Sequence, residues 1–170
     1  MELVQLLYEN EQEFLREYKI DLAFTRDITP LEHINTEKIH TDTLSLIVPE
    51  NHVIRTFEDI DASSLMPEKF ILPMADNQST YIAVIQQFFE LFSFEPKRYL
   101  FSDFGSTIMA LVSQGLGLSV LPSSFLHHSA PGIRFIELPV KSDLYVSWRA
   151  EDNSQILKNI LDIIHSTLTI

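Results

Sequence analysis

Side chains that could hold a metal ion are present, but they are not spaced as a metal site. The chain contains six histidines and no cysteine. The histidines comprise one adjacent pair and four distant residues: His127 and His128, then His33, His40, His52 and His165. Zinc sites on a helix place two histidines one turn apart, as in HExxH, and the sequence has no such pair. We therefore expect no metal site and no cofactor, and we interpret the histidines as solvated loop residues.

Motifs for nucleotide binding and nucleophilic catalysis are missing from the sequence. Gly115 and Gly117 lack a third glycine and follow a predicted helix, whereas the dinucleotide fingerprint precedes one. Ser123 and Ser124 follow Pro122 without the GxSxG pattern of a nucleophile elbow. The acidic residues are scattered, and we assign no catalytic residue. A small α/β enzyme stays open as an alternative, because folding can bring together catalytic groups that form no local motif.

The charge of the chain argues against contact with nucleic acid. Its 24 Asp and Glu residues outnumber its 12 Lys and Arg residues, which gives a formal charge of −12. Nucleic-acid affinity rests largely on Lys and Arg contacts to phosphates, and no basic stripe is present. No apolar run reaches membrane-spanning length, and the start of the chain lacks the pattern of a signal peptide. We expect no membrane partner and a cytoplasmic location, although a mature periplasmic protein would also fit.

The predicted elements alternate between strands and helices. Apolar runs predict strands at residues 3–8, 21–24, 43–49, 70–73, 98–101, 118–122, 133–138 and 144–149. Helical spacing predicts helices at residues 10–18, 57–65, 79–92, 106–114 and 156–168. Gly115 suits the left-handed position that ends a helix. This alternation indicates an α/β fold with mostly parallel sheets.

Several segments resemble one known family, in the family's order and spacing. Residues 107–122, TIMALVSQGLGLSVLP, are similar to the family segment "alV.aGlGisllP". Residues 21–26, DLAFTR, resemble "lDlai..r", and residues 44–52, LSLIVPENH, resemble "l.lvvp..Hpl". Phe94-Glu95-Pro96 is similar to "Gf.P", with Ser93 in place of its glycine. The chain thus resembles the effector-sensing domain of LysR-type bacterial transcription regulators.

This resemblance implies a two-lobed, type 2 periplasmic-binding-protein-like α/β fold with an effector between the lobes. The expected boundaries are residues 1–54 for the first part of lobe I, 55–142 for lobe II, and 143–170 for the return to lobe I. The family's winged helix-turn-helix precedes the sensing domain, which itself begins with a strand and a helix that we expect to be missing here. Lobe I is then expected to be incomplete, and homodimer formation weakened.

The resemblance also indicates where an effector would bind. Ligands of open α/β folds collect beyond the carboxyl ends of strands, often at helix N-termini, where free N–H groups favour anions. The candidate contacts by position in the family pattern are Thr25, Arg26, Asp27, Ser79, Thr80, Tyr81, Asp103 and Phe104. Competing interpretations stay open, because Ser79 and Thr80 can also act as helix caps and Arg26 can pair with an acid.

The function implied by the resemblance is the sensing of a small metabolite, expected to be a small organic anion. In a complete regulator, its binding would shift the population of conformations and change how the subunits hold DNA. One alternative is a fragment of a periplasmic solute-binding protein, which shares the architecture. A second is the small α/β enzyme, and a third is a nonfunctional remnant, which predicts poor folding.

Overall fold

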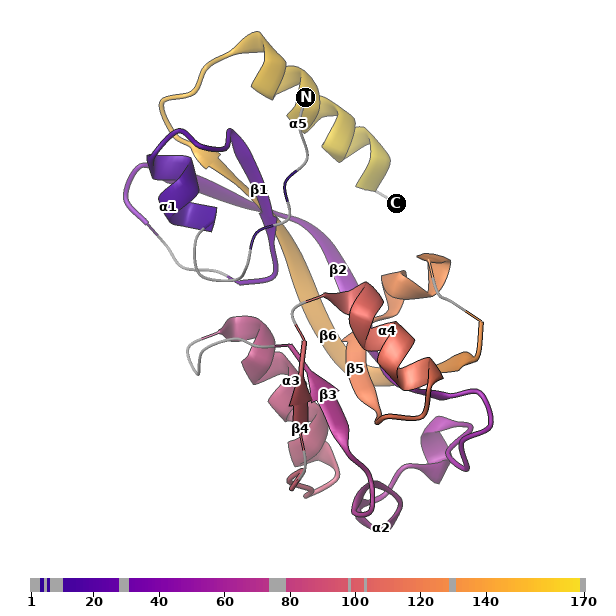
Figure 1. The fold of residues 1–170 in the computed structure, drawn as a ribbon. Helices are drawn as coiled ribbons and strands as arrows, with labels where there is room; N and C mark the ends of the chain where they lie inside the picture. Colours follow the sequence, from indigo (N-terminus) through magenta and orange to yellow (C-terminus); the bar gives the residue numbers. More distant parts are fainter. Residues whose placement is uncertain are drawn as a thin grey trace. The chain divides into compact units, whose positions relative to one another are not determined.

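The chain folds into two compact units (Figure 1). Unit 1 comprises residues 1–41 and 143–170, and unit 2 comprises residues 42–142. This computed structural model describes residues 4, 6, 11–27, 31–73, 79–97, 99–102, 104–128 and 131–168. The lobe boundaries expected from the sequence stay a prediction, and the first change of unit falls earlier in the chain than the end of the expected lobe. The strand predicted at residues 3–8 lies mostly outside the described residues.

Two long strands contribute residues to both units. They are β2 (Ile34–Pro49) and β6 (Ile133–Arg149). The other elements of unit 1 are α1 (Glu11–Arg16), β1 (Leu22–Thr25) and α5 (Gln155–Leu168). Unit 2 contains η1 (Phe57–Asp59), α2 (Ala62–Leu65), β3 (Phe70–Leu72), α3 (Thr80–Leu91), β4 (Tyr99–Phe101), α4 (Gly105–Ser113), β5 (Ser119–Pro122) and η2 (Ser123–His128).

The described strands form one four-stranded and one two-stranded sheet. The larger sheet has the order β1-β6-β2-β5, in which β1 pairs with β6 and β2 pairs with β5 in antiparallel fashion. In the smaller sheet, β3 and β4 are parallel, with Phe70 opposite Tyr99, and Phe70 also forms a parallel bridge to Leu118. The prediction of mostly parallel sheets is therefore wrong for the larger sheet. Apolar runs identify buried strands but do not reveal their direction.

The core of unit 2 lies on both faces of β3. Phe70 packs against the rings of Phe88 and Phe89 on α3, with centroids 6.4 and 5.1 Å away. The next residue, Ile71, belongs to a second cluster that includes Ile108 of α4. Successive strand residues point to opposite faces of a sheet, so α3 and α4 cover opposite faces (Figure 1). Each fully buried side chain of this size contributes about 1.5–3 kcal/mol.

The ends of the two long helices of unit 2 follow the sequence signals. The Ser79 hydroxyl accepts a hydrogen bond from the Ile82 amide at 3.1 Å and caps α3. Gly115 follows α4 with φ +71°, which confirms the predicted left-handed stop. Gly117 is required for close approach, since a Cβ atom there would lie 2.7 Å from the Lys69 carbonyl oxygen.

Several predicted bounds differ from the structure. The strand predicted at residues 43–49 begins at Ile34, and the two strands predicted at residues 133–138 and 144–149 form one strand. The added part of β2 is largely exposed and polar, so it lacks the apolar run used for prediction. The predicted helix at residues 57–65 is divided into η1 and α2, and the predicted His127–His128 loop belongs to η2.

Candidate functional site

A polar group on unit 1 lies where β1 ends. Thr25 is the last residue of β1, and its Oγ1 accepts a hydrogen bond from the Asp27 amide at 3.0 Å. Thr25 is buried, whereas Arg26 and Asp27 are half-buried. The three predicted unit 1 residues, which are consecutive in the sequence, thus lie at the carboxyl end of β1, and their contact with an effector stays a prediction. The described chain resumes at residue 31.

Glu11 joins this group and was missed by the sequence analysis. It is the first residue of α1, and its carboxyl group is hydrogen-bonded with the Thr25 side chain. Burial raises the pKa of the Glu11 carboxyl, the bond with Thr25 acts in the opposite direction, and the nearby charge of Asp27 raises it further. An acidic residue in the first turn of a helix is common, so its type alone gave no signal of a buried position.

The predicted residues at the start of α3 have different surroundings. The Ser79 hydroxyl is used as the N-cap, and Tyr81 is 4% exposed within the hydrophobic core. Thr80 between them is exposed. Thr80 is therefore the residue of this set that presents its side chain to solvent, while Ser79 and Tyr81 fix the start of the helix.

The ends of β3 and β4, the strands that precede α3 and α4, lie side by side. The Ser102 amide, just after β4, donates to the Leu72 carbonyl at the end of β3 at 3.0 Å. Phe104 is the N-cap residue of α4 and is 40% exposed. Among the described residues, its side chain makes no capping hydrogen bond. The predicted contact Asp103 lies outside the described residues.

The first turn of α4 also carries exposed hydroxyls. Ser106 and Thr107 are both exposed, and Gly105 before them packs closely on the Phe125 ring. A Cβ atom at Gly105 would lie 2.4 Å from that ring, so the start of α4 can pack this closely on η2 only because residue 105 is glycine. Backbone N–H groups in the first turn of a helix lack carbonyl partners within the helix and favour anions.

An open groove is present in unit 1. Its volume is about 510 Å³, and it lies between residues 37–41 of β2 and the end of α5. Ile164, His165 and Leu168 line the helical side, and His165 Nε2 lies 2.9 Å from Glu37 Oε1. The sequence analysis named none of these residues as ligand contacts.

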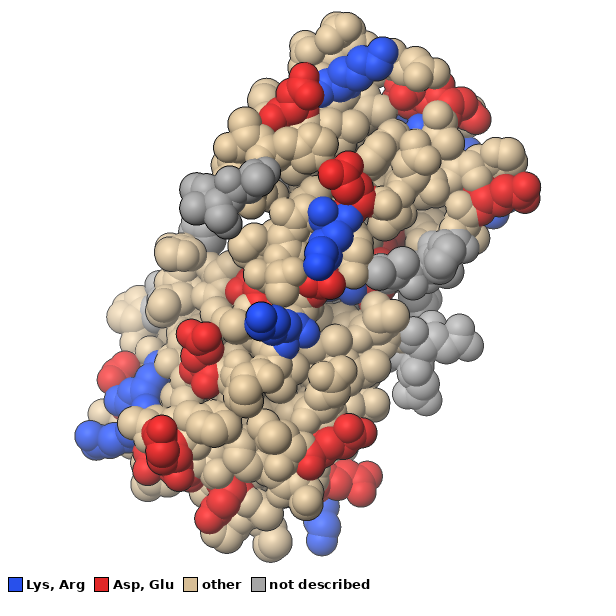
Figure 2. Space-filling model, turned by 180° about the vertical axis from the view of Figure 1, so that it is seen from behind, with Lys and Arg blue, Asp and Glu red and all other residues tan. Residues whose placement is uncertain are grey.

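Charged side chains of both signs are interspersed on the face of the molecule that Figure 2 shows. On the face in Figure 2, blue basic groups alternate with red acidic groups and form no continuous basic patch. Among the described residues, no group of three His, Asp or Glu side chains is arranged to hold a metal ion. Within the same residues, no helix is long and apolar enough to cross a membrane.

Comparison with known sequences identifies relatives among bacterial transcription regulators. The chain is 22% identical over 152 residues to the HTH-type transcriptional regulator XapR of Escherichia coli, covering 86% of this chain and 50% of XapR. It is 21% identical over 168 residues to the HTH-type regulator AlsR of Bacillus subtilis, covering 96% of this chain and 55% of AlsR. The chain thus spans about half the length of these curated relatives.

Solved structures share the fold. The effector-binding domain of a BenM variant matches with a TM-score of 0.78 at 18% identity, covering 95% of this chain and 77% of that domain. The BenM effector-binding domain with its effector benzoate matches with a TM-score of 0.74 at 20% identity, covering 98% of this chain and 77% of that domain. The regulatory domain of CcmR from Synechocystis PCC6803, in complex with 2-PG, matches with a TM-score of 0.72 at 21% identity, covering 94% and 79%.

The family model decides the assignment, since it extends over almost the whole chain. The model of the LysR substrate binding domain matches residues 2–169. The fold agrees with it, because the neighbouring structures are effector-binding domains of this family with the two-lobed periplasmic-binding-protein-like α/β fold. The chain therefore belongs to the LysR substrate-binding domain family.

Proposed function

We propose that this domain senses a small organic anion within a LysR-type transcription regulator. The observation that carries the proposal is the family match over residues 2–169, since that family's domain binds small molecules. Polar groups beyond the ends of β1, β3 and β4 support it, because this is where ligands of α/β folds collect. Solved structures of similar fold include the BenM effector-binding domain with benzoate and the QuiR effector-binding domain with shikimate.

The proposed contacts belong to both units. On unit 1 they are Thr25, Arg26 and Asp27, and on unit 2 they are the exposed Thr80 and Phe104. Ser79, Tyr81 and Asp103 complete the proposed set, with Ser79 and Tyr81 acting mainly through the start of α3. The first turn of α4 supports the choice of an anion, since its N-cap side chain makes no capping bond among the described residues.

The regulator as a whole is also part of the proposal. We propose that its DNA contact is made outside this chain, because the net charge of −12 disfavours phosphate binding. We propose a cytoplasmic location and a homodimer, and no catalytic role, in line with relatives that are transcription regulators. Sedimentation velocity over a range of chain concentrations tests the homodimer, which predicts a concentration-dependent second species.

Thermal unfolding with benzoate and with shikimate, followed by circular dichroism, tests the effector class. A bound anion at 100 times its Kd stabilises the native state by about 2.7 kcal/mol, so the transition midpoint should rise. Neutral benzamide is the matched control for benzoate and should leave the midpoint unchanged.

A pair of serine variants locates the effect. Ser106→Ala removes an exposed hydroxyl in the first turn of α4, two residues after the proposed contact Phe104, and should reduce the rise in midpoint. Ser113→Ala, at the end of the same helix, removes only a hydroxyl bond to the Ala110 carbonyl and should preserve the rise. If a set of small carboxylates that includes both probes leaves the midpoint of the wild-type chain unchanged, the anionic effector is contradicted.

A further inference from the structure

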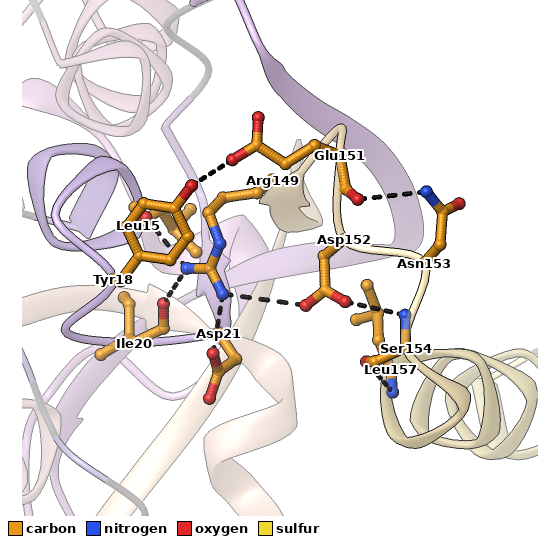
Figure 3. Close-up of polar contacts among 10 residues, drawn as sticks. All are labelled: Leu15, Tyr18, Ile20, Asp21, Arg149, Glu151, Asp152, Asn153, Ser154 and Leu157. Atoms are coloured by element: carbon orange, nitrogen blue, oxygen red, sulfur yellow. Dashed lines mark hydrogen bonds and ion pairs between the residues drawn. The ribbon is translucent and has the colours of Figure 1, made fainter.

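Arg149 is a buried residue at the centre of a polar network in unit 1 (Figure 3). It is the last residue of β6 and is 6% exposed. Its Nη1 donates to the carbonyl oxygens of Leu15 at 2.9 Å and Ile20 at 2.6 Å. Its Nη2 donates to Asp21 Oδ1 at 2.7 Å and lies 3.7 Å from Asp152 Oδ2. One side chain thus holds the end of α1, the start of β1 and the connection to α5.

Tyr18 covers this network from the solvent side. Its ring centroid lies 4.5 Å from the Arg149 guanidinium carbon, and its hydroxyl donates to Glu151 (Figure 3). Tyr18 has a left-handed backbone with φ +58°, a conformation that is costly for any residue with a Cβ atom. The contacts with Arg149 and Glu151 act against this backbone cost.

The network continues into the remaining elements of unit 1. Asp152 Oδ1 accepts a hydrogen bond from the Ser154 amide at 2.9 Å, and Ser154 Oγ accepts one from the Leu157 amide at 3.2 Å. The Ala150 amide donates to the His33 carbonyl at 2.9 Å, just before β2. The described elements of unit 1 are therefore all tied to residues 149–154.

Unit 2 is held together differently. The two hydrophobic clusters of the described residues consist of unit 2 side chains, with Phe70 and Phe88 among those fully buried. Unit 1 contributes far fewer of the buried apolar residues described: Leu15, Ala23, Val146, Leu157 and Ile164. Regions with little buried apolar surface open more easily than regions with a hydrophobic core.

We propose that unit 1 is a separate cooperative unit whose order depends on Arg149, so that unit 1 opens while unit 2 stays folded. The buried guanidinium supplies donors to several oxygens at once. Its removal takes a donor from the Leu15 and Ile20 carbonyls and an opposite charge from the Asp152 carboxylate, which is 17% exposed, whereas the Asp21 carboxylate, 84% exposed, stays in water. One consequence rests on the proposed function: the Thr25 group at the end of β1 is then present only while the Arg149 network is intact.

Hydrogen–deuterium exchange of the full chain, read by mass spectrometry, tests the proposal without any ligand. Arg149→Met should accelerate exchange throughout unit 1, in residues 11–25 and 155–168, by about 100-fold or more. Protection in β3, α3 and β5 should stay at the wild-type level. The matched control is Arg134→Met in unit 2, which removes bonds to Glu50 and Ile54 and should affect exchange only near residues 50–56.

Two further variants extend the test. Arg149→Lys should not restore protection, because one ammonium group cannot replace the fork that reaches Leu15, Ile20 and Asp21 together. Asp152→Asn should give a weaker form of the same pattern across unit 1. Loss of protection in unit 2 of Arg149→Met, or loss confined to residues 15–21 with α5 unchanged, would overturn the proposal.

Discussion

Ser93 occupies a backbone position at which glycine should make the protein more stable. Ser93 follows α3, and its backbone adopts the left-handed conformation with φ +49°. Its side chain is exposed. Its amide donates to the Glu90 carbonyl at 3.0 Å, and the Phe94 amide donates to the Phe89 carbonyl at 2.9 Å. These bonds form a Schellman motif, in which glycine is the preferred residue.

The expected gain for Ser93→Gly follows from two opposing terms. A residue with a Cβ atom loses about 1–2 kcal/mol in the left-handed region. The added freedom of glycine in the unfolded chain costs about 0.4–1 kcal/mol. We therefore expect Ser93→Gly to raise the free energy of unfolding by about 0.5–1 kcal/mol. Ser93→Ala keeps the Cβ atom and should give no gain.

Tyr18 provides a matched comparison, because the same backbone position follows α1. The Lys19 amide donates to the Phe14 carbonyl at 2.9 Å, and Tyr18 has φ +58°. Tyr18→Gly removes the same strain but also the ring contact with Arg149. It also removes the hydrogen bond with Glu151. We expect no gain in the free energy of unfolding, or a loss.

Urea unfolding measures both variants. Far-UV circular dichroism follows the whole chain, and the fluorescence of Trp148, the single tryptophan, reports on unit 1. A stability for Ser93→Gly that is equal to or below that of wild type would refute the reasoning about backbone strain. An equal gain for Tyr18→Gly would refute the role assigned to the tyrosine contacts.

Three further predictions concern a buried acid, a close backbone approach and the core. Glu11 has a raised pKa in the folded chain, so the free energy of unfolding falls as pH rises through that pKa. Glu11→Gln should therefore stabilise the chain at pH 7 but not at pH 4. A Glu11→Gln variant less stable than wild type at pH 7 would contradict this. Gly117→Ala should lower the free energy of unfolding by about 1–3 kcal/mol, whereas Gly115→Asn, with open space around its Cβ position but a left-handed backbone, should lower it by less in the same urea titration. Phe88→Ala should cost about 3–5 kcal/mol because Phe88 is fully buried, whereas Phe104→Ala, at an exposed site, should cost less than about 1 kcal/mol.

Local patterns were sufficient for the helices of unit 2 and their ends. The apolar spacing from Ile82 to Phe92 predicted α3, and the serine before it proved to be the cap. The glycine after α4 has the left-handed backbone that was expected. These features depend on side chains within a few residues of each other, so the sequence contains the information directly.

The candidate site was only partly predictable. The position of Thr25 after an apolar run placed it correctly at the end of a strand. Its contact with Glu11, from a helix earlier in the chain, depends on how α1 packs against β1. Tyr81 could equally have been a surface or a core residue from its place in the helical pattern, and packing against the Phe70 cluster placed it in the core.

By itself, the sequence determined the family, the alternation of strands and helices, and the acidic character of the surface. Only the tertiary structure decided that the polar residues from Ile34 onward belong to β2, because a strand of this kind is stabilised by its neighbour rather than by its own pattern. The tertiary structure also decided that Arg149 is buried. Its type predicts a charged surface residue, and its burial became favourable because Leu15, Ile20 and Asp21, distant in sequence, supply acceptors for its guanidinium.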